Sequence, residues 1–132
     1  MAAALGGVSV KLLVPGKSDS GFVNAAAKSH YEDLLKAGVE LYMYQLGFVH
    51  AKTMVIDREV GIVGSANMDF RSFDLNFEAN AIVYDPKIAE ELAEDFYEDL
   101  EGSKRITLEE WQNRPLFHQL YHKIAGLFSP IL

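Results

Sequence analysis

The spacing of hydrophobic and polar positions changes along the chain between a period of two and a helical period. Residues 8–14 form an apolar run bounded by turn residues, which predicts a strand. Residues 22–37 have helical spacing, with Asp19 or Ser20 as the expected N-terminal cap and Gly38 as the stop. The chain therefore opens with a strand followed by a helix.

The middle of the chain is rich in short β-type segments. Residues 39–44 alternate between apolar and polar positions and predict a strand. Residues 53–56 and 60–63 are β-branched or apolar and flank a short polar break, which predicts a hairpin. A short helical turn is expected over residues 68–73, and a further strand over residues 78–84.

The last third of the sequence predicts helices with clear start and stop signals. Asp85-Pro86 combines a cap with a proline at the first helical position, and this helix should run to about Leu100 and stop near Gly102. Residues 107–110 fit a capping box that opens a short helix. Residues 116–127 predict an amphipathic helix. Strands alternating with helices predict an α/β fold, with a mixed β-sheet flanked by helices.

Composition narrows the class of protein. The 132 residues fit a single domain, and 49% hydrophobic residues suffice for one core. The absence of cysteine excludes disulfides and thiolate metal sites. The net charge of −7 argues against bulk binding of nucleic acid and against passive attraction to anionic lipid, which would need a local basic patch. The acidic residues between Asp85 and Glu110 are interpreted as a solvated helix face.

Candidate chemistry is concentrated around the predicted hairpin. His50 and Lys52 are two residues apart, so an extended strand would project them on the same side. Gly64 permits a sharp turn or a close approach, and Ser65 and Asn67 add a hydroxyl and an amide beyond the strand end. Imidazole, ammonium, hydroxyl and amide groups together suit a phosphodiester, whose charge the donors share while histidine attacks phosphorus or moves a proton.

The spacing of these residues resembles a known signature. The pattern His50-x-Lys52-x4-Asp57-x6-Gly64-Ser65-x-Asn67 looks like the HKD motif of the phospholipase D superfamily. The flanking sequence is similar to the C-terminal half of the bacterial cardiolipin synthase branch. That similarity lies in residues 10–15, 65–73, 75–78, 83–85, 108–111 and 114–115.

The resemblance implies roles for individual residues. His50 would form a phosphohistidine or protonate the leaving alcohol, and Lys52 would bind the substrate phosphate. Glu78 matches a carboxylate that commonly accepts the proton on the far imidazole nitrogen, although a strand-edge charge is the alternative. Asp57 belongs to the catalytic signature, but its place at the far end of the strand favours a structural role in the turn.

Four further positions near the motif have expected roles. Ser65 and Asn67 would help Lys52 to bind phosphate, and a turn-capping role is the alternative for Ser65. Asp69 and Arg71 are expected to brace the motif loop. The implied mechanism needs no cofactor and no metal, and the helical pair His118 and His122 lacks a third ligand at a telling distance.

The chain also departs from the family pattern. It contains one His-x-Lys motif where such synthases carry two, and it has no apolar run of the ~20 residues needed to span a bilayer. We therefore expect a fragment that lacks the first strand and helix of its half and the whole N-terminal half. The resemblance implies a bacterial cytoplasmic membrane location, cytosol-facing or peripheral, with this chain itself soluble.

The resemblance implies a reaction in which phosphatidyl groups move between two phosphatidylglycerols through a phosphohistidine. The expected partners are the phospholipid, an N-terminal HKD half or a second copy, and a membrane surface reached through the full-length enzyme, with no nucleic acid. The alternatives are a homodimeric phospholipase D-like hydrolase or nuclease, and an inactive fragment. The apolar residues near the C-terminus, including Trp111 and Phe117, are expected in the core, and residues 127–132 could contact a bilayer or a missing half.

Overall fold

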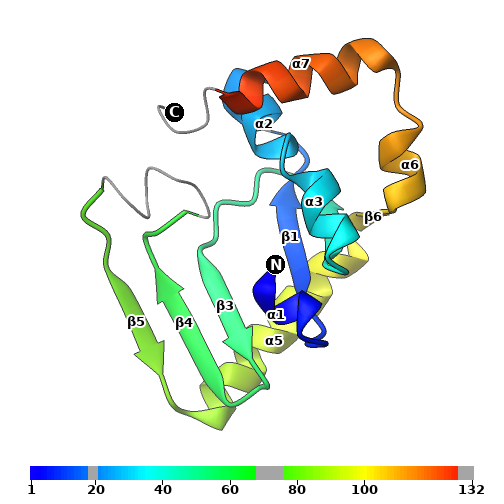
Figure 1. Ribbon diagram of the computed structural model, residues 1–132. Helices are drawn as coiled ribbons and strands as arrows, with labels where there is room; N and C mark the ends of the chain where they lie inside the picture. Colours follow the sequence, from blue (N-terminus) through cyan, green and yellow to red (C-terminus); the bar gives the residue numbers. More distant parts are fainter. Residues whose placement is uncertain (18–20, 68–75, 128–132) are drawn as a thin grey trace. The chain divides into compact units, whose positions relative to one another are not determined.

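The computed structural model describes residues 1–17, 21–67 and 76–127. These residues form two compact units (Figure 1). The terminal unit comprises Met1–Val49 and Ser103–Leu132, and the motif unit comprises His50–Gly102.

The terminal unit combines a small mixed sheet with helices. Its elements are α1 (Ala2–Leu5), β1 (Lys11–Pro15), α2 (Gly21–Lys28), α3 (Tyr31–Lys36), β2 (Glu40–Tyr44), β6 (Ser103–Ile106), α6 (Leu108–Gln112) and α7 (Leu116–Leu127). β2 lies between β1 and β6, parallel to the first and antiparallel to the second. Parallel strands need a crossover, and α2 and α3 form it between β1 and β2.

The core of the terminal unit lies where the sheet meets α3 and α6. Leu41 is fully buried in the central strand, and Val14 and Ile106 of the neighbouring strands join it. Tyr31 and Trp111 close this cluster with ring centroids 5.2 Å apart. Residues that are far apart in the sequence therefore pack together around the central strand β2.

A second, smaller contact in this unit joins α2 to α7. It is made by alanines, since Ala25 and Ala26 of α2 pack against Ala125 of α7 and all three are buried. Small side chains let the two helices approach closely. The contact therefore buries little apolar area compared with a leucine-rich helix pair.

The motif unit is an antiparallel sheet packed on one helix. Its elements are β3 (Thr53–Ile56), β4 (Val60–Gly64), β5 (Asn80–Val83) and α5 (Pro86–Glu101), with β4 in the middle. Asp85 caps α5 by accepting from the backbone N–H groups of Lys87 and Ile88. Ala89 and Ala93 are its buried residues, and a Cβ at Gly61 would lie 2.8 Å from Leu92 Cδ1. The helix and the middle strand are therefore in close contact.

Most sequence predictions for these elements are confirmed. The α/β class, the hairpin, and the helices beginning at Pro86 and Leu116 are present, as is the capping box of Thr107 and Glu110. The strands form two three-stranded sheets, and β1 and β5 are shorter than predicted. The structure adds α1 and β6, which the sequence pattern did not indicate.

The prediction of one helix over residues 22–37 is wrong, because the helix is broken between α2 and α3. Ser29 Oγ donates to the carbonyl of Ala26 at 2.6 Å, and the backbone N–H of His30 bonds to Ala27 at 3.2 Å. Serine competes in this way with the helical bond pattern. The predicted caps Asp19 and Ser20, and the predicted turn at residues 68–73, lie outside the described residues.

One further property concerns the membrane. Within residues 1–17, 21–67 and 76–127, no helix combines the length and the apolar character that crossing a bilayer requires.

The central strand of the terminal unit provides a test of the core. Leu41→Ala should lower the free energy of unfolding by about 2–5 kcal/mol, because it leaves a cavity at a fully buried position. Trp111, the single tryptophan, lies in the same cluster, so its fluorescence in urea reports this unit. Leu46→Ala, at a residue 78% exposed, is the matched control and should change stability by less than about 0.5 kcal/mol.

The motif unit provides a second test at Gly64. A Cβ there would lie 2.6 Å from the backbone carbonyl oxygen of Ala79 and 1.9 Å from Asn80 Oδ1. Gly64→Ala should therefore separate β4 from β5 and weaken hydrogen-exchange protection in the motif unit, at a cost of about 1–3 kcal/mol. Gly21→Ala is the control, since a Cβ at Gly21 meets nothing within 4 Å. Unchanged protection in Gly64→Ala would contradict this close approach.

Candidate active site

The candidate site is carried by the β3–β4 hairpin, whose turn consists of Asp57 and Arg58. Both have positive φ angles, 52° and 57°, and the Glu59 N–H bonds to the Ile56 carbonyl at 3.0 Å. Asp57 and Arg58 are the central residues of this β-turn, within a three-residue loop over residues 57–59, and Asp tolerates a positive φ better than Arg does. The register is therefore set by a tight turn that places Ile56 opposite Val60.

Arg58 is held in this unusual conformation by contacts with α5. Its guanidinium forms an ion pair with Glu90 and lies over the Tyr97 ring, 5.4 Å from the centroid. The charge of Glu90 also raises the pKa of Arg58. These contacts tie the turn to the helix, so the turn end of the hairpin has a structural function.

His50 and Lys52 lie at the opposite, open end of the hairpin. The carbonyl of Lys52 accepts from the Gly64 N–H at 3.1 Å, which extends the strand ladder beyond Thr53. Lys52 Nζ donates to the backbone carbonyl of His50 at 2.9 Å, and the His50 side chain is exposed. His50 and Lys52 thus lie at one end of the hairpin and Asp57 at the other, and the contact that joins the first two runs from the ammonium to a backbone carbonyl, so their predicted juxtaposition through the side chains stays a prediction.

Ser65 joins this end of the hairpin to Glu78. Ser65 Oγ donates to Glu78 Oε2 at 2.5 Å and accepts from the Ala79 N–H at 3.0 Å. The backbone N–H of Ser65 in turn donates to the Ala79 carbonyl at 3.0 Å. The serine therefore fixes the position of the carboxylate as well as the strand pairing.

Asn76 adds a second donor to the same carboxylate. Its Nδ2 lies 3.3 Å from Glu78 Oε1, so both carboxylate oxygens of Glu78 accept a hydrogen bond. Asn67 is exposed just beyond β4, and Asp69 and Arg71 lie outside the described residues. Over the described residues, no group of three metal-ligating side chains comes together.

The sequence reasoning missed two features of this site. The first is the bond between Ser65 and Glu78, which a register of β4 against β5 could have indicated, because Gly64 pairs with Asn80. The second is the anchoring of Arg58 by α5, for which the sequence carries no local signal.

The geometry supports a specific kind of chemistry. The imidazole of His50 and the ammonium of Lys52 precede β3, and the hydroxyl of Ser65 follows β4. A backbone hydrogen bond from Gly64 to Lys52 connects these two strand ends. A cation and neutral donors can share the charge of a phosphate oxygen, and the imidazole can transfer a proton or attack. The two hydrogen-bond donors hold the Glu78 carboxylate in place at this end of the hairpin.

Solved structures of similar fold include phospholipase D relatives. Nuc, a phospholipase D family member from Salmonella typhimurium, aligns with a TM-score of 0.69 and 22% identity over 80% of this chain and 69% of that one. Phosphatidylserine synthase from Haemophilus influenzae aligns with a TM-score of 0.71 and 13% identity over 99% of this chain and 37% of that one. At these identities the likeness concerns the fold.

Sequence comparison gives closer relatives. The major cardiolipin synthase ClsA of Bacillus subtilis is 48% identical over 130 residues, which is 98% of this chain and 27% of that protein. Cardiolipin synthase 1 of Staphylococcus epidermidis is 50% identical over 130 residues, which is 98% of this chain and 26% of that protein. The chain thus spans about a quarter of the length of these relatives.

A family model described as "Cardiolipin synthase, PLD-like domain" matches residues 1–100, which include the entire motif from His50 to Asn67. The model and the relatives agree with the fold and with the resemblance of the motif. The chain belongs to the cardiolipin synthase group of phospholipase D-like domains.

Proposed function

We propose that this chain supplies one HKD half of a cardiolipin synthase-type phosphatidyltransferase. The observation that carries the proposal is the open end of the β3–β4 hairpin, where His50, Lys52 and the Ser65–Glu78 pair lie. Relatives named cardiolipin synthase, which match 98% of the chain, support the choice of a lipid reaction over other phosphodiester chemistry. We propose that the enzyme is bacterial and that this site faces the surface of the cytoplasmic membrane.

The proposed reaction moves a phosphatidyl group between two phosphatidylglycerols in two displacements. One histidine attacks phosphorus, the P–O bond to glycerol breaks, and a second histidine gives its proton to the departing glycerol oxygen. The hydroxyl oxygen of the second lipid then attacks phosphorus, its proton passes to the second histidine, the P–N bond to the first histidine breaks, and cardiolipin leaves. His50 takes one of these two roles.

The remaining site residues have supporting roles in this proposal. Lys52 and Asn67 bind the non-bridging phosphate oxygens and stabilise the charge that develops on them, and Ser65 joins them by turning its hydroxyl from Glu78 to the phosphate. Glu78 accepts from the far imidazole nitrogen of His50, which selects the tautomer and stabilises the imidazolium. Asp57 acts through the turn, at the end of β3 away from the phosphate.

The second histidine must come from another HKD motif, because the sequence has one His-x-Lys. We infer that a preceding half of the same enzyme provides it, and a second copy of this chain is the alternative. Water in place of the lipid alcohol would make the same site a phospholipase D-like hydrolase. Product analysis distinguishes the outcomes, since transfer yields cardiolipin and free glycerol whereas hydrolysis yields phosphatidic acid.

The first prediction concerns His50. In an assembly that contains a second HKD half, His50→Ala should lower the rate of cardiolipin formation from phosphatidylglycerol vesicles at least about 100-fold. The reason is that the variant lacks either the nucleophile or the proton donor, whichever of these roles His50 takes. His30→Ala is the control, since His30 is exposed and makes no side-chain cap for α3. Full activity in the His50→Ala assembly would refute the assignment of the site.

The second prediction concerns Glu78. Glu78→Gln should reduce kcat about 100-fold or more while changing KM little, because the carboxylate acts through His50. Glu59→Gln, in the exposed hairpin turn, is the control. A loss that appears as a raised KM with kcat unchanged would contradict a role through His50.

A further inference from the structure

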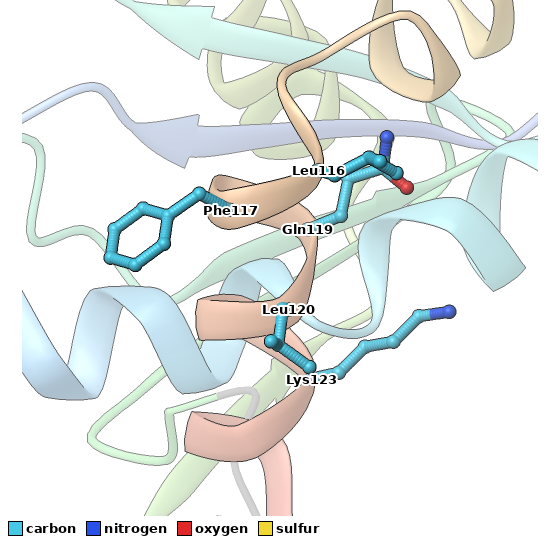
Figure 2. Close-up of a pocket in the computed structure, with 5 residues that line it drawn as sticks. All are labelled: Leu116, Phe117, Gln119, Leu120 and Lys123. Carbon is cyan, nitrogen blue, oxygen red and sulfur yellow. The ribbon is translucent and has the colours of Figure 1, made fainter.

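A surface hollow lies along the exposed face of α7. It is lined by Leu116, Phe117, Gln119, Leu120 and Lys123 (Figure 2). In this view the Phe117 ring and the Lys123 ammonium extend from opposite sides of the helix. With Lys123 as its one charged side chain, this lining does not identify a ligand by its chemistry. A polar side chain with a defined partner lies instead in the motif unit, and it is Asn76.

Asn76 has no part in the proposed reaction so far, although it contacts the carboxylate that acts through His50. Its Nδ2 donates to Glu78 Oε1 at 3.3 Å, from a position two residues earlier in the chain. Asn76 and Glu78 thus meet through their side chains, while Phe77 between them is fully exposed. An ionised carboxylate only accepts hydrogen bonds, so the amide nitrogen of Asn76, and not its oxygen, is the atom that faces it.

Ser65 also donates to this carboxylate, but its hydroxyl carries a single proton. In the structure Ser65 Oγ donates to Glu78 Oε2 at 2.5 Å. When the hydroxyl donates to a phosphate oxygen, as the proposed reaction requires, it no longer donates to Glu78. The serine itself stays in place, because its backbone N–H and its Oγ are each 3.0 Å from a backbone partner in Ala79. Glu78 therefore loses this donor at the moment when phosphate is bound.

The amide of Asn76 is not exchanged in this way, because the phosphate ligands of the proposed site are other residues. We propose that Asn76 is a positioning residue that keeps the Glu78 carboxylate directed at His50 during turnover. Asn76 holds Oε1, and Oε2, which Ser65 leaves, accepts from the far imidazole nitrogen of His50. This role rests on the proposed function, since it acts through Glu78 and His50.

The neutral charge of the amide suits this role. A lysine or arginine at the same place would pair with the carboxylate and compensate its charge. An amide donor orients the carboxylate and leaves its negative charge for the imidazolium that forms on His50. Asn76 therefore supplies direction without weakening the electrostatic effect of Glu78.

Two single variants test the need for a donor at this position, in an assembly that contains a second HKD half and acts on phosphatidylglycerol vesicles. Asn76→Ala should lower kcat about tenfold and change KM less than about twofold, because the loss falls on a group that acts in the transition state. Asn76→Asp is nearly isosteric but replaces the donor by an acceptor, so it should lower kcat at least as much. Full activity in Asn76→Asp would overturn the proposal, since filling the space would then suffice.

A double-mutant cycle separates a role through Glu78 from a structural role in the loop. Added to Glu78→Gln, Asn76→Ala should change kcat less than about twofold, because the carboxylate that it positions is already absent. An equal loss in both backgrounds would assign Asn76 a structural role and overturn the proposal. Asn113→Ala, at an exposed asparagine that follows α6, is the control and should leave kcat unchanged in both backgrounds.

A second cycle tests the exchange at Ser65. Because Ser65 has left Glu78 when phosphate is bound, Asn76→Ala should cost about tenfold in kcat in a Ser65→Ala background as well. A loss that appears only when Ser65 is also replaced would show that the serine still holds Glu78 during turnover. The proposal would then be wrong, since Asn76 would merely substitute for Ser65.

The same measurements distinguish a failure of this proposal from a failure of the proposed reaction. Full activity in Glu78→Gln would refute the role of Glu78, and the role of Asn76 with it. A loss of about 100-fold in Glu78→Gln, together with unchanged kcat in Asn76→Ala, would refute the role of Asn76 alone. The expected result is a loss in both single variants that does not add in the double variant.

Discussion

The register between β3 and β4 is the constraint on which the candidate site depends. A shift of one residue would turn every side chain of the hairpin to the opposite face. The Asp57–Arg58 turn prevents that shift at one end, and the hydrogen bond from Gly64 to Lys52 closes the ladder at the other. The imidazole of His50 and the carboxylate of Glu78 take their positions from this backbone framework, since both residues lie just outside the regular strands.

Two of the amphipathic helices among the described residues, α5 and α7, use their faces in different ways. α5 buries Ala89 and Ala93 against its own sheet and exposes its acidic residues, as a solvated surface helix does. α7 buries Ala125 and exposes its leucines and Phe117. Apolar residues at a similar helical spacing can therefore pack into a core in one helix and stay exposed in another. The difference lies in what the inner face meets, which for α7 is the alanine surface of α2.

Local signals in the sequence were the most dependable. Asp85-Pro86 and the Thr107–Glu110 box predicted helix starts correctly, because a cap is a contact between residues two or three positions apart. The single helix predicted over residues 22–37 was wrong, because the sequence does not show whether the hydroxyl of Ser29 leaves the helical bond pattern intact or takes a backbone carbonyl. The sequence pattern did not indicate β6, because Ile106 is its one buried residue. The strand forms through its pairing with β2, which a local pattern does not show. Phe117 was expected in a core and is exposed.

The sequence alone determined which reactive side chains the chain carries and the hairpin beside them, since both follow from the residues and the spacing between His50 and Asn67. It also determined the helix boundaries that depend on caps. The tertiary structure decided which residues act together over longer distances. Glu78 meets Ser65 only through the pairing of β4 with β5, and α7 shows its apolar face only because its inner face fits α2. Contacts of that kind depend on how elements pack, and a periodic pattern has the same appearance whether its apolar face is covered or open.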